Sequence, residues 1–346
     1  MIRKHTISAM VASISIAASR AAVSADVPES SDPIKVIMND WTGQHVSTKI
    51  AGALLEKMGY NIEYVSAGAL PQHPGLAQGN LHFQAEVWSN NVGDLYPKMV
   101  ESGEIVVLGD LGLEPKEGWI YPPYMEERCP GLPRYEALYD CAQAFANAET
   151  FPNGRLITCP ADWGTRSRDV VAGIDLPFNA IAGGSEGAMI AELTSAIASE
   201  EPIISIFWQP HWLFAAHDLN WVEWTPIEGE CVEENQGKEN ACGFAQATVN
   251  KVAWSGFEGK WPAAFKMLSM MSLTNADQNA GILEVDNKGR DIHEVAAEWV
   301  ENNQATWTPW IDAAINKWLS GPVGSPRSGT AHRRFGARYW QSRTCA

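Results

Sequence analysis

Short apolar segments alternate with helical patterns along most of the chain, and this alternation constrains the fold more than any other feature. Strand-like segments occupy residues 34–40, 61–68, 81–88, 103–113, 155–163 and 203–208. Helical periodicity runs through residues 46–60, 185–199, 291–303 and 307–319, and Ser185 is a suitable N-cap for the second of these helices. We therefore expect an α/β fold with mostly parallel sheets.

The length and charge of the chain narrow its architecture and its partners. A chain of 346 residues is too long for one small core, so two lobes are expected. The formal net charge of −16 argues against nucleic acid or an anionic membrane surface as a partner. The same charge is compatible with a cationic ligand.

The two ends of the chain differ from its body. Arg3 and Lys4 precede a short apolar run, and small residues precede Asp26, which predicts a cleaved signal peptide over residues 1–25 and a periplasmic protein. Residues 321–346 contain five arginines and no acidic residue in an otherwise acidic chain. We expect this atypical basic tail to be disordered and to take no part in the fold.

Six cysteines in an exported chain predict disulfides. Cys129 and Cys141 flank one short loop, and Cys231 and Cys242 flank another. Each pair is expected to form a disulfide, with free buried thiols as the alternative. Cys159 and Cys345 have no assigned partner. No CxxC motif or paired histidine spacing accompanies them, so neither a metal nor a cofactor is predicted.

Four tryptophans lie at or just beyond the ends of predicted strands: Trp41, Trp88, Trp163 and Trp208. In open α/β sheets, ligands bind beyond the carboxyl ends of the strands, so these four residues are expected to meet in one cleft. Taken singly, each has the simpler interpretation of a side chain that caps a hydrophobic layer. As a set, they favour a shared site.

Converging indole rings favour a cationic ligand, because the faces of the rings carry negative potential. A quaternary ammonium or tertiary sulfonium suits such a site best. It has no N–H groups that would lose their hydrogen bonds on entering an apolar cavity. Sugar stacking is the competing use of exposed tryptophans, but few polar side chains accompany these four.

Three of these tryptophans lie in segments that resemble a known family. The segments QAEVWSNN, CPADWG and FWQPHW, together with residues 34–60, resemble the glycine betaine/proline betaine substrate-binding proteins of ABC importers. The resemblance covers residues 34–319. It implies the type II periplasmic-binding-protein fold, which has two α/β lobes with a ligand cleft between them. Lobe I would then comprise residues 32–118 and 247–320, and lobe II residues 119–246.

The resemblance also implies particular ligand contacts. Trp88, Trp163 and Trp208 match the tryptophans of the family's box, and Gly164 and Thr165 stand where backbone amides bind a ligand carboxylate. Trp41 is not a box residue in the best-known relatives, but its position at a strand end makes it a candidate fourth wall. His211, Asn91 and Trp119 are further candidates.

Two positions depart from the family pattern. Val92 stands where some relatives place a histidine that binds the carboxylate, and Thr165 replaces the cysteine that usually pairs with Cys159. These departures bear on the identity of the ligand within its class.

The expected function is capture of betaine-type onium osmolytes, namely glycine betaine, proline betaine or dimethylsulfoniopropionate, for an ABC permease with a separate ATPase. We expect a monomer without catalytic activity. A choline-specific binding protein is the first alternative. A secreted carbohydrate hydrolase that uses Glu86 and Asp162 is the second, although no catalytic motif accompanies them. A binding module for chemosensing remains a third.

Overall fold

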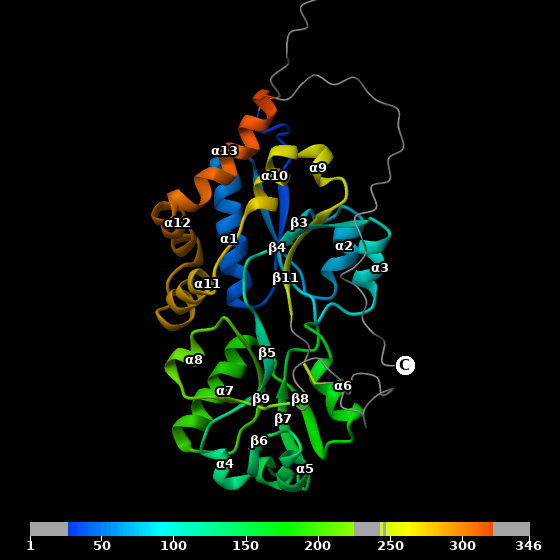
Figure 1. Ribbon diagram of the computed structural model, residues 1–346, viewed down its shortest axis with the longest axis vertical. Helices are drawn as coiled ribbons and strands as arrows, with labels where there is room; N and C mark the ends of the chain where they lie inside the picture. The colour runs from blue at the N-terminus through cyan, green and yellow to red at the C-terminus, as the bar shows by residue number, and fades with distance from the viewer. Residues whose placement is uncertain (1–26, 225–242, 245–246, 321–346) are drawn as a thin grey trace, which may run out of the picture.

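The computed structural model describes residues 27–224, 243–244 and 247–320, with only the backbone described for residues 316–320. The predicted signal peptide and the basic tail lie outside the described residues. Two lobes follow one another along the long axis of the molecule, and each contains a five-stranded sheet (Figure 1).

Lobe I is built on the sheet β2-β1-β3-β11-β4. Its strands are β1 (Ile34–Met38), β2 (Ile62–Ser66), β3 (Phe83–Trp88), β4 (Ile105–Asp110) and β11 (Val249–Trp254). Its helices are α1 (Thr42–Lys57), α2 (Gln72–Ala77), α3 (Leu95–Glu101), α9 (Phe257–Lys260), α10 (Pro262–Met270), α11 (Asn275–Ile282), α12 (Ile292–Asn302) and α13 (Gln304–Ser320), with a π-helical turn, η3 (Leu283–Asn287), after α11.

Lobe II is built on the sheet β10-β5-β9-β7-β8. Its strands are β5 (Lys116–Tyr121), β7 (Gly154–Thr158), β8 (Phe178–Ala182), β9 (Ser205–Gln209) and β10 (Asn220–Trp221), and β6 (Pro130–Pro133) lies outside this sheet. Its helices are α4 (Met125–Arg128), α5 (Ala137–Cys141), α6 (Arg166–Gly173), α7 (Glu186–Ser199) and α8 (Leu213–Ala216), with a 3-10 turn, η1 (Ala142–Phe145).

Both sheets are mixed, which corrects the expectation of mostly parallel sheets. Strands β1, β2 and β3 are parallel, but β11 runs antiparallel to both β3 and β4. In lobe II, β7 is parallel to β8 and β9, but β5 is antiparallel to β9. The antiparallel strands β5 and β11 are the first strands after each passage of the chain between lobes. They enter their sheets from the opposite lobe, and so their direction reverses.

The first passage between the lobes lies between Asp110, the end of β4, and Lys116, the start of β5. The predicted boundary at residues 118 and 119 falls inside β5, which pairs along its length with β9 of lobe II. The chain returns to lobe I between β10 and β11.

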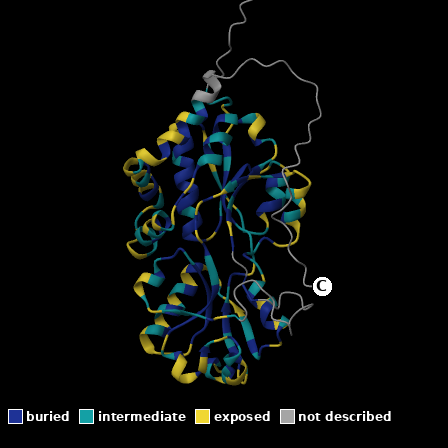
Figure 2. Cartoon of the chain, in the orientation of Figure 1, coloured by how far each residue is buried: buried dark blue, intermediate teal, exposed yellow. Residues whose placement is uncertain are grey.

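Buried residues follow the sheets and the inner faces of the helices in both lobes, and exposed residues lie on the outer helices (Figure 2). Each of the ten predicted elements has a counterpart in the structure, although many of the observed elements were not predicted. Ser185 caps α7 by accepting a hydrogen bond from the backbone N–H of Ala188 at 3.2 Å. All six predicted strands are shorter in the structure than expected; in particular, β7 ends at Thr158, before Trp163, and β9 begins at Ser205.

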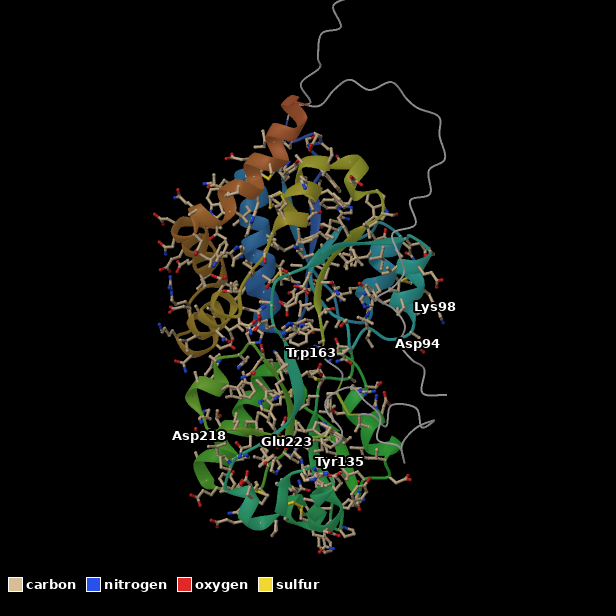
Figure 3. All side chains as sticks on the ribbon, viewed as in Figure 1. Asp94, Lys98, Tyr135, Trp163, Asp218 and Glu223 are labelled. Atoms are coloured by element: carbon tan, nitrogen blue, oxygen red, sulfur yellow. A yellow bond between two sulfur atoms is a disulfide. The ribbon has the colours of Figure 1, made fainter. Side chains whose placement is uncertain are left out.

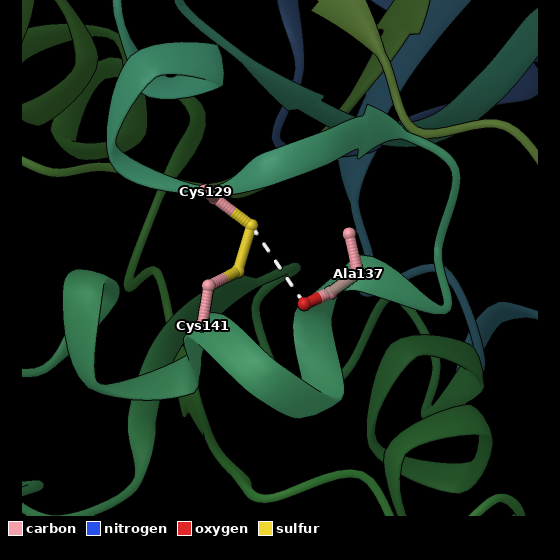
Figure 4. The surroundings of a disulfide bond; sticks show 3 residues. All are labelled: Cys129, Ala137 and Cys141. Atoms are coloured by element: carbon pink, nitrogen blue, oxygen red, sulfur yellow. Dashed lines mark hydrogen bonds between the residues drawn. A yellow bond between two sulfur atoms is a disulfide. The ribbon is translucent and has the colours of Figure 1, made fainter.

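Cys129 and Cys141 form the expected disulfide, which joins the end of α4 to α5 with the two Cα atoms 5.2 Å apart (Figure 4). The predicted pair Cys231 and Cys242 lies outside the described residues, as does Cys345. Cys159 is a buried free thiol. Among the described residues, no helix combines the length and apolarity needed to cross a bilayer.

Candidate functional site

The four strand-end tryptophans line a single cavity where the two lobes meet. Figure 3 shows Trp163 at this junction. The cavity has a volume of about 520 Å³, part of which is open to solvent. Its lining consists of Trp41, Ala69, Gln72, His73, Glu86, Val87, Trp88, Asn91, Val92, Glu117, Cys159, Trp163 and Trp208. We call Trp41, Trp88, Trp163 and Trp208 the tryptophan cage.

Each lobe supplies two rings of the cage. In lobe I, Trp88 is the last residue of β3, and Trp41 precedes the first turn of α1. In lobe II, Trp208 lies near the end of β9, and Trp163 lies in the turn between β7 and α6. Trp163 contacts Trp208 edge-on, with ring centroids 5.5 Å apart. The strand topology thus brings together side chains that are up to 167 positions apart in the chain (208 − 41).

Glu86 lines the cavity beside the two lobe I rings, to which it is hydrogen-bonded, and is 1% exposed. Its Oε1 accepts hydrogen bonds from the indole Nε1 of Trp41 at 2.8 Å and of Trp88 at 2.9 Å. Its Oε2 accepts from Gln278 Nε2 at 2.7 Å and from Ser47 Oγ at 3.1 Å. Burial raises the pKa of Glu86, and these four donors oppose that rise.

A second carboxyl group, Glu117 on β5, lines the cavity from lobe II. Its Oε2 accepts a hydrogen bond from Asn90 Nδ2 of lobe I at 2.6 Å. Burial raises the pKa of Glu117 to about 7. Glu117 was not among the predicted site residues, and the available indication was an acidic residue beside the apolar run Trp119–Tyr121.

Gln72 and His73 of α2 also line the cavity. Neither was among the predicted site residues. His73 is 2% exposed and packs on the ring of Tyr96 at a centroid distance of 4.8 Å. Burial lowers the pKa of His73 to about 4, so the ring is neutral at neutral pH. Neither lysine nor arginine occurs among the described residues that line the cavity.

Gly164 and Thr165 line a second cavity of about 460 Å³, which shares Asn91, Glu117 and Cys159 with the first. The two residues therefore adjoin the tryptophan cage without lining it. Gly164 has φ of +144°, and a Cβ added there would overlap the side-chain amide of Asn91 from lobe I. Only glycine allows the two lobes to approach this closely here.

Two further candidates lie outside the cavity. Trp119 is buried in the core of lobe II, where its Nε1 donates to Ser167 Oγ at 2.9 Å. His211 packs against Trp208 with ring centroids 6.1 Å apart, but it faces the lobe junction near Glu186 and Asp286. Asn91, the third further candidate, does line the cavity, three residues after Trp88 on the lobe I side.

Glu186, His211 and Asp286 form an acidic cluster between the lobes, with one candidate metal-ligand atom from each within 4.8 Å of the others. His211 Nε2 lies 3.5 Å from Glu186 Oε1 and 3.7 Å from Asp286 Oδ2. However, the backbone N–H of Leu213 donates to His211 Nδ1 at 3.1 Å, which places the ring proton on Nε2. In this tautomer Nε2 has no lone pair for a metal, so the cluster is better suited to joining the lobes.

Several other contacts cross between the lobes. The backbone N–H of Thr42 donates to Glu186 Oε2 at 2.7 Å, and Trp212 Nε1 donates to Asp286 Oδ2 at 3.2 Å. The N–H of Leu70 donates to the carbonyl oxygen of Asp162 at 3.1 Å. These contacts hold the lobes together around the cage.

Comparison with known proteins agrees with this arrangement. Residues 32–302 match the family described as the substrate-binding domain of the ABC-type glycine betaine transport system. The chain belongs to this family.

Two relatives of known ligand show how much of the chain the sequence similarity covers. The trimethylamine N-oxide-binding protein of Pelagibacter ubique is 26% identical over 89% of this chain and 99% of its own length. The glycine betaine/proline betaine-binding periplasmic protein of Salmonella typhimurium is 22% identical over 85% of this chain and 93% of its own length.

Solved structures of the family share the fold. The glycine betaine/L-proline-binding protein of Borrelia burgdorferi superposes with a TM-score of 0.69 at 19% identity, covering 84% of this chain and all of that one. The predicted type II periplasmic-binding-protein fold with two α/β lobes is thereby confirmed, as is the resemblance to the glycine betaine-binding family.

Proposed function

We propose that the chain is the extracytoplasmic solute-binding protein of an ABC importer and that it captures small methylated onium osmolytes in the tryptophan cage. The observation that carries this proposal is that indole rings from both lobes line one cavity. Among the described residues, the lining of this cavity contains two carboxyl groups and no lysine or arginine. Membership of the family supports transport as the role and a solute-binding protein, not an enzyme, as its type.

The cage accounts for the recognition of the onium group. A cation over an indole face gains about 0.5–2 kcal/mol, depending on how far it is desolvated. Three or four such contacts supply most of a micromolar affinity, which corresponds to about 8 kcal/mol. Methyl groups on the nitrogen or sulfur fill the apolar space between the rings and have no hydrogen bonds to lose.

The polar end of the ligand would extend from the cage toward the second cavity. A betaine carboxylate would meet the backbone amides of Gly164 and Thr165, as the family resemblance implies. In an N-oxide the oxygen is bonded directly to the nitrogen and so extends less far from the cage. This oxygen would accept a hydrogen bond from protonated Glu117. Because the pKa of Glu117 is about 7 and the trimethylamine N-oxide-binding relative spans nearly the whole chain, we add trimethylamine N-oxide to the betaines as a ligand.

Choline is the second candidate, and the same carboxyl group is the reason. Above the pKa of about 7, ionised Glu117 would accept a hydrogen bond from the choline hydroxyl and add a second negative charge to the cavity. Choline binding should then strengthen as pH rises, whereas binding of an N-oxide should weaken.

Closure of the lobes would report capture to the transporter. Each lobe supplies two rings, so a ligand that touches all four favours the closed state by its differential affinity for that state. The partners proposed are an inner-membrane permease and its separate ATPase. Export by the predicted signal peptide to the periplasm and a monomeric state complete the proposal.

The contacts of Glu86 weigh against the carbohydrate-hydrolase alternative. Both of its oxygens already accept hydrogen bonds from the protein. A general acid must give a proton to the substrate, and a carboxylate engaged in this way has no proton directed to the cavity.

Isothermal titration calorimetry with glycine betaine, proline betaine, dimethylsulfoniopropionate, trimethylamine N-oxide and choline tests the proposal. We expect saturable binding of at least one of these compounds, with a parallel change in tryptophan fluorescence. Maltose serves as the control for sugar stacking. Saturable binding of maltose and of none of the onium compounds would refute the proposed function.

A further inference from the structure

We propose that Glu86 sets the charge selectivity of the tryptophan cage, both as the positioning residue for two of its indoles and as the buried counter-charge of the onium group. This inference rests on the proposed function, because it concerns the same cavity. It goes further in assigning the preference for a cation to one carboxylate and not to the rings alone.

The position of Glu86 follows from the strand that carries it. Glu86 and Trp88 are two residues apart on β3, so their side chains leave the same face of the sheet. Trp41 reaches the same carboxylate oxygen from the turn that precedes α1. One oxygen atom thus fixes the orientation of two rings that come from different elements.

The hydrogen-bond partners of Glu86 indicate that it is ionised. An indole N–H is a donor and cannot accept, so Oε1 carries no proton toward Trp41 or Trp88. At Oε2, the amide Nε2 of Gln278 donates at 2.7 Å and the hydroxyl of Ser47 donates at 3.1 Å. Four donors around two oxygens match a carboxylate, and they favour this ionised form against the effect of burial, which raises the pKa of Glu86.

All four of these partners are neutral groups, so they solvate the charge without cancelling it. A buried carboxylate without a counter-charge is unfavourable, and a cation that enters the same cavity relieves this cost. A ligand of the same shape without the positive charge gives no such relief. The indole faces alone would discriminate less, because they also pack well against uncharged methyl groups.

A pair of ligands of the same shape isolates this effect. Glycine betaine and 3,3-dimethylbutanoate differ only in the central atom of the trimethyl group, which is nitrogen with a positive charge in one and neutral carbon in the other. The ratio of their dissociation constants, measured by calorimetry, reports the selectivity of the cage for charge. Loss of packing alone would weaken both ligands and leave the ratio unchanged.

The informative variant is Glu86→Gln, which keeps an acceptor oxygen for the two indoles and removes the charge. We expect the preference for glycine betaine over 3,3-dimethylbutanoate to fall at least tenfold. Glu63→Gln, on the exposed side of β2, removes the same charge from the chain and should leave the ratio unchanged. Circular dichroism and the urea unfolding midpoint verify that each variant is folded.

A second variant keeps the inference testable if Glu86→Gln does not fold. Gln278→Leu removes one donor to Oε2 and leaves both indole contacts in place, so it destabilises the ionised form of Glu86. We expect the ratio to fall several-fold in this variant. An unchanged ratio in whichever of the two variants folds would overturn the inference.

The wild-type measurement separates this inference from the proposed function. If the wild-type protein binds none of the onium compounds, the proposed function fails. If it binds glycine betaine and prefers it to 3,3-dimethylbutanoate, but Glu86→Gln weakens both ligands equally, the proposed function stands and Glu86 is merely structural.

Discussion

The indole rings of Trp41 and Trp163 lie with their centroids 5.0 Å apart and their planes inclined by 61°, although the two residues belong to opposite lobes. Trp163 in turn contacts Trp208, so an unbroken row of rings crosses the junction. The cage is therefore complete only when the lobes meet. Affinity for the proposed ligand and closure of the lobes form one equilibrium, and a change in either shifts both.

We expect Trp208→Ala to weaken glycine betaine binding at least tenfold, or about 1.4 kcal/mol, because it removes one ring of the cage. Trp208→Phe should lose less, since it keeps an aromatic face. Trp221→Ala is the matched control, because Trp221 stacks on Phe214 outside the cavity at a centroid distance of 5.0 Å. Calorimetry measures all three. Equal affinity of Trp208→Ala and wild type would make Trp208 a purely structural residue.

Gly164→Ala should impair closure and weaken binding more than tenfold. Its Cβ would overlap Asn91 across the lobe junction, and φ of +144° strains any side chain at this position. Small-angle scattering with saturating ligand should show a larger radius of gyration for the variant than for wild type. Gly184→Ala, where φ is +75° and the added Cβ meets no atom within 4 Å, is the control for backbone strain alone.

Glu117→Gln should change how stability depends on pH. The pKa of Glu117 rises from 4.5 to about 7 on folding, so the native state holds a proton that the unfolded state releases. The free energy of unfolding of the wild type therefore loses this contribution as pH rises between those two values, and the loss is complete above the upper value.

Urea unfolding across this pH range measures the effect. Glutamine does not titrate, so the stability of the variant relative to wild type should increase with pH over the same window. Other groups with shifted pKa values, such as His73, are present in both proteins and cancel in the difference. A difference that is independent of pH would contradict the raised pKa.

Replacing Cys129 and Cys141 together by serine should lower the free energy of unfolding by about 2–3 kcal/mol, because the disulfide closes a short loop in the unfolded chain. Glycine betaine affinity should stay within twofold of wild type, since neither cysteine lines the cavity. Urea unfolding without reductant, together with calorimetry, tests both expectations. A large loss of affinity in a folded variant would show that the loop acts on the site.

The sequence predicted local features well, because they depend on neighbouring residues. The N-cap at Ser185 and the apolar β9 could both be predicted from a few consecutive residues. The direction of each strand could not be predicted in this way, since it depends on the lobe from which the strand enters its sheet. The antiparallel placement of β5 and β11 followed from two passages between the lobes, which no local pattern records.

Within the site, the sequence by itself determined which aromatic side chains were candidates, because a tryptophan that follows an apolar strand lies at the edge where a ligand binds. Only the tertiary structure decided what surrounds them. Glu117, Gln72 and His73 line the cavity, whereas Trp119 lies in the core, and their immediate sequence neighbours give no reason for the difference. Glu86 joins Trp41, Trp88, Ser47 and Gln278 through hydrogen bonds that span up to 192 positions. Such contacts depend on how the sheet and helices pack, and that packing is a property of the whole folded chain.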